Sequence, residues 1–285
     1  MGLAGDSTLI TPPFPENNQW SLPVESNPRV WIETLRHSHD RLAGMVTPLT
    51  PEQLREQSYC TDWSLAQVLS HLGSGAEISL LGLPGALGEG EPVSRESFGP
   101  VWDRWNAKSP DDQAADALAI DEQQVETLEK LTDEQLAGMR MDFFGMQLDA
   151  VGIIRLRLSE HALHSWDVAV YSDPGATVPD DAAGLLVDNV PTFLAPRLGK
   201  PLPEPFAVRI TTTGPERDYL LTSGESVSMT DWPGESGGED VPHVTMPAES
   251  LLRLAYGRLD PEHTPAGVTG DQDALDKLRL IFPGF

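Results

Sequence analysis

The chain has 285 residues, more than a typical single domain, so two cores are expected. Lysine and arginine number 19 against 44 aspartate and glutamate residues, and the resulting net charge of −25 argues against nucleic acids and anionic membranes as partners. A single cysteine, Cys60, excludes an internal disulfide framework and a cysteine-rich zinc knuckle. No run reaches the ~20 apolar residues that span a bilayer, so a cytoplasmic protein is expected.

The first half of the chain predicts helices. Residues 1–27 contain four prolines and are expected to form an extended arm. Helical periodicity begins at Pro28 and continues to Pro48. A second helix is expected to begin near Asp62 or Ser64, and it carries His71 at the edge of its apolar face.

The next segment predicts the rest of a bundle. Residues 82–100 are rich in glycine and proline and are expected to form a long loop. One or two helices are expected over 101–139, and a fourth long helix over about 147–171. Four amphipathic helices with a long crossover connection are typical of a helical bundle, here assigned to residues 28–174.

The fourth helix carries a candidate metal site. Glu160 and His164 are four residues apart, about 6 Å along a helix, and can converge on one ion. His161 and His164, three residues apart, can do the same, so spacing leaves both pairs open. With His71 as a third ligand, one coordination position would stay open, as in catalytic zinc sites.

Arg157 and Asp167 lie on the same face of this helix and could orient the ligands through hydrogen bonds. The alternative is an exposed helix face that carries an Arg–Glu pair and a His–Asp pair.

The composition changes after Pro174, which predicts a second domain over residues 175–285. A helix is expected over 185–198, interrupted or begun anew near Pro191. Short alternating runs separated by glycine and proline predict an antiparallel sheet with strands at 206–212, 219–222, 226–229 and 243–245. Closing helices are expected at 247–257 and 271–281. The predicted fold class is therefore a four-helix bundle followed by a small α+β domain.

Two segments resemble a known family. The segment from Cys60 to His71, Cys-Thr-Asp-Trp-Ser-Leu-Ala-Gln-Val-Leu-Ser-His, resembles the "CPGW…VxDLxxHL" segment of DinB-like bundles in the mycothiol-dependent maleylpyruvate isomerase group. The segment from Arg157 to Asp167 resembles that group's "RxxExxxHxWD" segment. Thr61-Asp62 stands where the family pattern has Pro-Gly. The order of elements after residue 175 is similar to the sterol-carrier-like domain that follows the bundle in this family.

The resemblance implies that His71, Glu160 and His164 bind Zn²⁺, which favours Glu160 over His161. It also implies mycothiol as a low-molecular-weight thiol cosubstrate and a small electrophile such as maleylpyruvate, with isomerase or S-transferase chemistry. The alternative is a non-catalytic, metal-stabilised ligand-binding or regulatory protein of the same fold.

Arg258, in the sequence Tyr-Gly-Arg, matches a Gly-Arg pattern of the family's C-terminal domain. An anionic electrophile needs a local cation in so acidic a chain, and arginine suits bidentate carboxylate binding. We therefore expect Arg258 to be catalytic, facing the cleft between the domains and orienting the substrate. The alternative is a surface arginine paired with Asp260 or Glu262.

Overall fold

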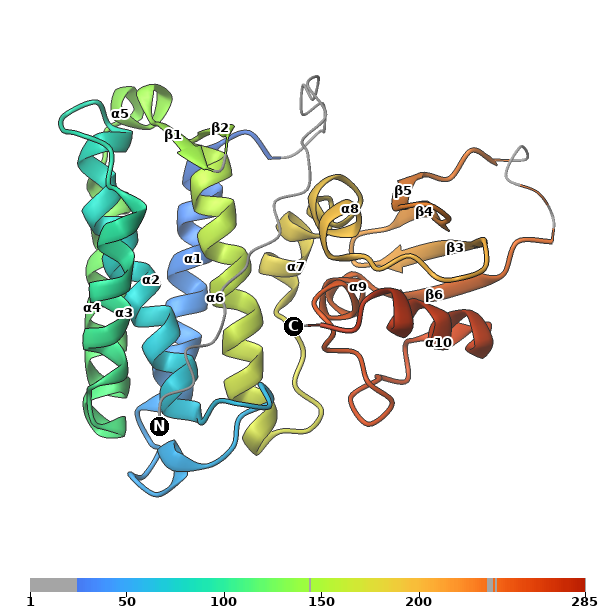
Figure 1. Cartoon of the computed structure of the whole chain (residues 1–285), viewed down its shortest axis with the longest axis horizontal. Helices are drawn as coiled ribbons and strands as arrows, with labels where there is room; N and C mark the ends of the chain where they lie inside the picture. Colours follow the sequence, from blue (N-terminus) through green and yellow to red (C-terminus); the bar gives the residue numbers. More distant parts are fainter. Residues whose placement is uncertain (1–24, 144, 235–237, 239, 285) are drawn as a thin grey trace.

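The computed structural model describes residues 25–143, 145–234, 238 and 240–284. Figure 1 shows a helical body beside an α+β body, with the chain passing from one to the other through α7. The predicted arm falls largely on residues 1–24, which lie outside the described residues. The boundary proposed between residues 174 and 175 stays a prediction. Within the described residues, no helix combines the length and apolarity needed to cross a membrane.

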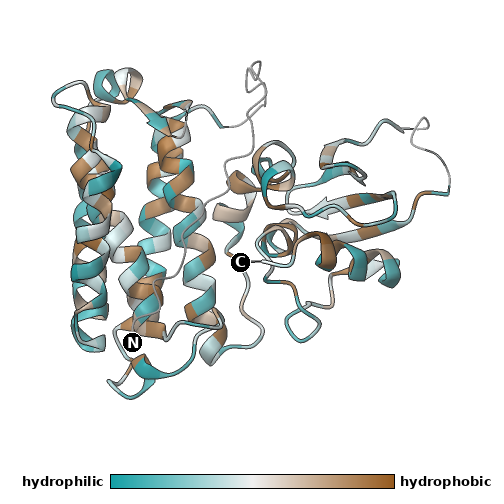
Figure 2. Ribbon diagram, in the orientation of Figure 1, coloured by the Kyte–Doolittle hydropathy of each residue, from teal (hydrophilic) through white to brown (hydrophobic). Residues whose placement is uncertain are grey.

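Four helices of 19 to 23 residues form the bundle: α1 (Pro28–Val46), α2 (Leu65–Ala86), α4 (Pro110–Lys130) and α6 (Ala150–Ser172). Each begins after a residue whose side chain accepts a hydrogen bond from a first-turn amide, namely Asn27, Ser64, Ser109 and Asp149. Hydrophobic residues concentrate where the helices face one another (Figure 2). The bundle core includes Trp31, Leu35, Leu69 and Leu158, all fully buried.

Shorter elements connect these helices. They are η1 (Gln53–Arg55), η2 (Arg95–Ser97), α3 (Phe98–Asn106) and α5 (Asp133–Gly138). A small hairpin of β1 (Arg140–Phe143) and β2 (Met146–Asp149), which the sequence analysis did not predict, precedes α6. The fourth helix therefore begins at Ala150, three residues later than expected.

The prediction of a loop over 82–100 is wrong at both ends. Helix α2 continues to Ala86 with Pro84 in its last turn, and α3 begins at Phe98. Gly85 lets the returning chain pack against this turn, because a Cβ atom there would lie 2.8 Å from the Cα of Pro92. Ala86 is buried, so tertiary packing holds a turn that local propensity disfavours.

The α+β body contains a five-stranded sheet in the order β5-β4-β3-β6-β7. Its strands are β3 (Phe206–Thr213), β4 (Arg217–Ser223), β5 (Val227–Asp231), β6 (His243–Pro247) and β7 (Thr269–Gly270). The sheet is mostly antiparallel, as predicted, but β3 and β6 pair in parallel. Alternate residues of β3 are buried, which gives the sheet one core face.

Helices complete this body: α7 (Asp180–Leu186), the π-helical turn η3 (Val190–Leu194), α8 (Ala195–Leu198), α9 (Ala248–Ala255) and α10 (Gln272–Ile281). The expected helix over 185–198 is thus interrupted around Pro191. Helix α9 packs against β3 and β6, and α7 contacts both α9 and α1. The α7 segment therefore ties the sheet body to the bundle.

The close approach of α2 and α4 gives a test of packing. A Cβ atom on Gly73 would lie 2.4 Å from the Trp105 ring and 3.0 Å from the Cα of Ala117. We expect Gly73→Ala to lower the free energy of unfolding by about 1–3 kcal/mol through overpacking. Gly44 in α1 has no atom within 4 Å of such a Cβ, so Gly44→Ala should raise it by about 0.5–1 kcal/mol. Urea unfolding followed by circular dichroism measures both changes, and equal effects at the two sites would contradict this packing.

Candidate metal centre

Three side chains from α2 and α6 converge at the cleft between the two bodies. Ser64 and Gln67 form a reciprocal capping box that fixes the start of α2, and His71 lies two turns further on. Nε2 of His71 is 3.1 Å from Oε2 of Glu160, and Nε2 of His164 is 3.7 Å from the same oxygen. The structure thus brings together all three residues that the resemblance implied as ligands.

The donor set fits a zinc ion. One ligand atom from each of His71, Glu160 and His164 lies within 4.8 Å of the others. In a tetrahedral site with bonds of about 2.0–2.1 Å, ligand atoms are ~3.4 Å apart, so small side-chain adjustments suffice. Two imidazoles and one carboxylate are also the donor set of several catalytic zinc sites, which leave a fourth position open.

The charges at the site keep the ligands ready for a cation. Desolvation acts to raise the pKa of Glu160, but the hydrogen bond from His71 and the nearby His164 outweigh it and lower the pKa to about 2. Burial lowers the pKa of His164, against the opposing effect of Asp167. The carboxylate is therefore ionised and the imidazole favoured in its neutral form near neutral pH, as metal binding requires.

Asp167 orients His164 from behind. Its Oδ2 lies 2.8 Å from Nδ1 of His164, so the imidazole donates Nδ1–H and directs the Nε2 lone pair toward Glu160. Asp167 is itself held by Arg258, whose Nε donates to Oδ1 and whose Nη2 donates to Oδ2, both at 2.7 Å. The support for His164 that was predicted as one option from the sequence is thus present.

Arg258 belongs to the α+β body, so this pair joins the two bodies directly. Its side chain is 8% exposed and that of Asp167 is fully buried. Desolvation acts to raise the pKa of Asp167, yet the hydrogen bonds from Arg258 and His164 lower it to about 2. Arg258 lines the cleft, and it pairs with Asp167 and not with Asp260 or Glu262.

The candidate ligands open into a cavity of about 590 Å³. Its walls come from the 59–63 segment before α2, from α6, and from residues 256–258 and 283–284 of the α+β body. The Trp63 ring lies 5.1 Å from that of His71, and the Tyr59 hydroxyl donates a 2.7 Å hydrogen bond to Asp260 across the interface. This volume suits a small organic ligand.

The wall on the α+β side includes two glycines, Gly257 and Gly284. Gly257 has φ of 70°, and a Cβ atom there would lie 2.3 Å from the Cα of Gly284. Tyr256 beside it donates or accepts a 2.5 Å hydrogen bond with Ser159 of α6. The sequence analysis did not identify Trp63, Ser159 or Tyr256 as cavity residues, because nothing in their spacing indicates which face meets the second domain.

Cys60 also borders the cavity. Its Sγ lies 3.2 Å from Oδ2 of Asp167 and 3.7 Å from Nη2 of Arg258. Burial and the negative charge of Asp167 raise the pKa of the thiol to about 12. Cys60 is therefore a protonated thiol near neutral pH that donates to Asp167, and it is poorly suited to act as a nucleophile.

His161 points away from the cavity, into the bundle. It is fully buried, with Nε2 2.9 Å from Asp121 and Nδ1 2.8 Å from the Ser38 hydroxyl. Arg157, the other residue considered as a support for the ligands, donates to Asp121 at 2.7 Å. Asp121 is 2.7 Å from His39 as well, so it is the centre of a separate buried polar network.

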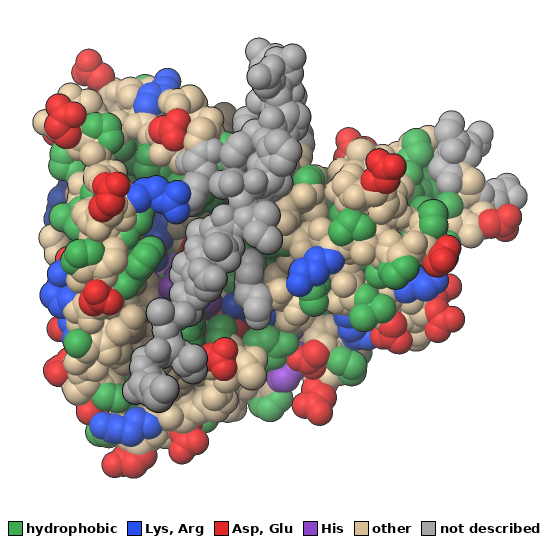
Figure 3. All heavy atoms as spheres, in the orientation of Figure 1, with side chains coloured by type: hydrophobic (Ala, Val, Ile, Leu, Met, Phe, Trp, Pro, Cys, Tyr) green, Lys and Arg blue, Asp and Glu red, His purple; other side chains and the backbone are tan. Residues whose placement is uncertain are grey.

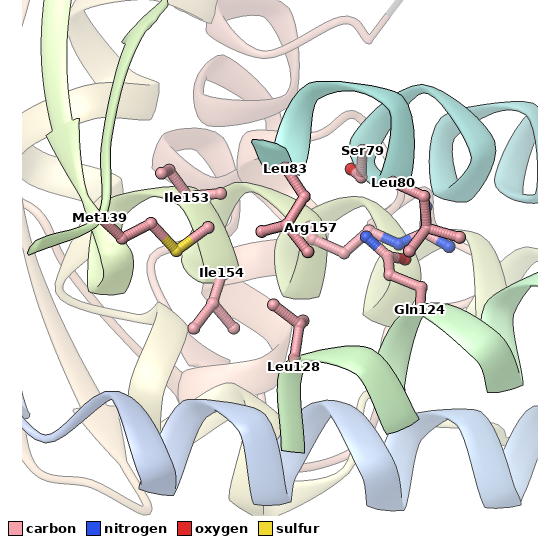
Figure 4. A pocket seen from close by; sticks show the side chains of 9 residues that line it. All are labelled: Ser79, Leu80, Leu83, Gln124, Leu128, Met139, Ile153, Ile154 and Arg157. Atoms are coloured by element: carbon pink, nitrogen blue, oxygen red, sulfur yellow. The ribbon is translucent and has the colours of Figure 1, made fainter. Parts of the chain in front are cut away.

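A second cavity lies beside this network, between α2, α4 and α6. Figure 4 shows Gln124 and Arg157 together at one end of it and aliphatic side chains such as Ile154 and Leu128 along the rest. Its volume of about 30 Å³ leaves room for about two water molecules and not for a substrate. The cleft cavity is therefore the candidate functional site.

Other groupings of potential ligands are less suited to a cation. His39, Asp40 and Glu122 lie close together, but the guanidinium of Arg36 contacts both carboxylates. Cys60, His164 and Asp167 also cluster, but Asp167 is already neutralised by Arg258. A fixed positive charge at these positions opposes metal binding.

The fold and the site define a helical-bundle protein with a His–Glu–His candidate metal centre that faces an α+β domain. The chain belongs to the mycothiol maleylpyruvate isomerase family: the family's N-terminal domain matches residues 35–169, and its C-terminal domain matches residues 180–277. A crystal structure of the mycothiol-dependent maleylpyruvate isomerase aligns with a TM-score of 0.62 at 15% identity, over 86% of this chain and 93% of that one. The two domain matches confirm the predicted family, and the structural similarity confirms the predicted fold.

Two further solved structures are similar to the chain. A mutant of the same isomerase aligns with a TM-score of 0.62 at 14% identity over the same shares of both chains. YfiT from Bacillus subtilis, described as a probable metal-dependent hydrolase with an unusual four-helix bundle topology, aligns with a TM-score of 0.42 at 18% identity, over 55% of this chain and 91% of that one. No curated protein matches the sequence.

The ligand set predicts a specific pattern of metal loss. We expect His71→Ala and His164→Ala to lose stoichiometric zinc, because each removes one of the three candidate ligands. His161→Ala should retain most of the metal, because both its ring nitrogens face Asp121 and Ser38. Elemental analysis of the purified variants, with the exposed His37→Ala as a surface control, measures the zinc content. Full zinc occupancy in His164→Ala would contradict the assignment.

The pair between the two bodies predicts a strong energetic coupling. Breaking a buried ion pair costs about 3–5 kcal/mol, so Arg258→Met and Asp167→Asn should each destabilise the protein strongly. The double variant should lose at least ~1.5 kcal/mol less free energy of unfolding than the sum of the two single losses. In the α+β body, Arg209 and Asp218 form a comparable bidentate pair with side chains 36% and 34% exposed.

A second double-mutant cycle on Arg209 and Asp218 is the control, and its coupling should stay below about 1 kcal/mol. Urea unfolding of both sets of variants provides the free energies. Equal coupling free energies in the two cycles would show that burial between the bodies does not strengthen the interaction of Arg258 with Asp167.

Proposed function

We propose that the chain is a zinc-dependent, thiol-using enzyme: a mycothiol-dependent isomerase or S-transferase that acts on a small electrophile. The observation that carries the proposal is the convergence of His71, Glu160 and His164 on the wall of a 590 Å³ cavity. When bound by these residues, zinc supplies the thiol in its thiolate form at neutral pH. The family and the similar isomerase structure support this chemistry by analogy.

The chain's own residues position the reactants. Asp167 holds the Nδ1 proton of His164 and so keeps its other ring nitrogen turned toward Glu160. Trp63, whose ring lies 5.1 Å from that of His71 and 5.9 Å from that of His164, gives the cavity an apolar wall beside the ligands. This wall offers apolar surface at the place where a thiol and an electrophile would meet.

The reaction joins the thiol sulfur to an electrophilic carbon of the substrate. In isomerisation, the adduct rotates about the former double bond and then eliminates the thiol. In S-transfer, the carbon that received the electron pair takes a proton and the sulfur–carbon bond is kept. The cavity is lined by both domains, which supports a role for the α+β body in holding the substrate.

The protonated state of Cys60 supports an external thiol. Because its pKa is raised to about 12, the thiolate is scarce at pH 7. We expect Cys60→Ser to keep substantial turnover and omission of the added thiol to abolish it. Product formation measured with mycothiol, with glutathione and without thiol tests this, and mycothiol should be the most effective. Equal turnover without any added thiol would contradict the proposal.

A further inference from the structure

We infer that this cavity accepts an uncharged electrophile in preference to a dicarboxylate such as maleylpyruvate. The inference rests on the proposed function, because it names the substrate class of the same site. The charges on the cavity wall differ from those needed to hold two carboxylates.

The cation expected to bind a substrate carboxylate is already engaged. Arg258 is the only lysine or arginine among the described residues that line the cavity. Its Nε and Nη2 donate to Asp167, and its Nη1 donates to the Tyr256 carbonyl at 3.0 Å. The pair is electrically neutral, so Arg258 acts as a positioning residue for His164 in place of the substrate contact predicted from the sequence.

The remaining charges on the cavity wall are negative. Asp62 is exposed at the wall, and among the described residues it makes no ion pair. Asp62 belongs to the Thr61-Asp62 pair, which stands where the family pattern has Pro-Gly. This departure therefore adds a carboxylate to the binding cavity, where a carboxylated substrate would be repelled.

The residues outside the described ranges cannot supply the missing charge. Residues 1–24, 144, 235–237, 239 and 285 include no lysine, arginine or histidine. A divalent ion at the candidate ligands would be balanced by Glu160 and by the incoming thiolate. The charge of the loaded site is therefore compensated before the electrophile arrives.

The rest of the wall suits an uncharged molecule. Tyr59, Trp63, Leu163, Tyr256 and Pro283 line the cavity, and together they offer aromatic and aliphatic surface. A neutral, activated alkene such as a maleate diester could bind there without desolvating a charge. The thiolate would add to one alkene carbon, and the other carbon would take a proton from water to give the thioether.

The experiment compares two electrophiles that differ in charge. Maleate and dimethyl maleate are each incubated with zinc-loaded protein and mycothiol, and each kcat/KM is divided by the rate constant of the uncatalysed thiol addition. We expect this ratio to be at least ~10-fold larger for the diester. Two like charges about 8 Å apart repel by roughly 2 kcal/mol at an effective dielectric constant of about 20, which is more than tenfold in rate. An equal or larger ratio for maleate would overturn the inference.

Variants of Asp62 test the origin of the preference. Asp62→Lys should raise the ratio for maleate several-fold, and Asp62→Asn should raise it less. Glu134→Lys makes the same change in net charge at an exposed position of α5, at the far end of the bundle, and should leave both ratios unchanged (Figure 1). The same gain in Glu134→Lys would assign the preference to the net charge of the chain and overturn the role of the cavity.

A binding measurement separates this inference from the proposed function. Saturation-transfer NMR on metal-free protein is recorded with succinate and with dimethyl succinate, which are unreactive analogues. Stronger transfer to the diester supports the inference, and equal or stronger transfer to succinate overturns it. If neither maleate nor its ester is accelerated, the proposed function fails, and the NMR pair alone decides the charge preference.

Discussion

The buried contact between Asp167 and Arg258 is the interaction on which the candidate site depends. It fixes the tautomer of His164, neutralises a carboxylate that has no exposed surface, and connects the bundle to the α+β body. Asp167 can stay charged in this buried position only because Arg258 is in place. The second domain thus contributes to the candidate metal centre, although the three candidate ligands all come from the bundle.

The strongly acidic composition makes such pairing important. Figure 3 shows aspartate and glutamate side chains spread over both bodies on the face in view. In the interior, the described buried carboxylates have cationic or imidazole partners: Asp121 contacts Arg157 and His161, and Glu249 contacts Arg253. Positive charge is therefore used mainly to compensate the chain's own acids, and little remains in the cavity for an anionic ligand.

The sequence predicted the features that depend on local pattern. Helical periodicity and capping residues such as Ser64 located the long helices, and the i, i+4 spacing of Glu160 and His164 placed both side chains on one face. Spacing alone did not separate Glu160 from His161, because both lie close to the direction of His164. Only the orientation of α6 in the bundle turns Glu160 to the cleft and His161 to Asp121.

The features that were missed depend on long-range contacts. The last turn of α2 persists through Pro84 because the chain packs back against Gly85, which no local rule anticipates. The parallel pairing of β3 with β6 depends on the connection between distant strands. The partner of Arg258 lies 91 residues away in sequence, so periodicity could identify the arginine as a candidate but not its contact with Asp167.

The backbone contact between Gly257 and Gly284 bears on how the cavity could diversify among related proteins. Gly257 has no space for a side chain beside Gly284, and both residues have positive φ values that disfavour one, so this wall has little freedom to vary by substitution. The opposite rim, at Thr61 and Asp62, is exposed and lies before the capping box of α2, so side chains can be exchanged there without disturbing the helix or its histidine. Divergence in ligand preference should therefore accumulate on one rim of the cavity while the facing wall keeps its shape.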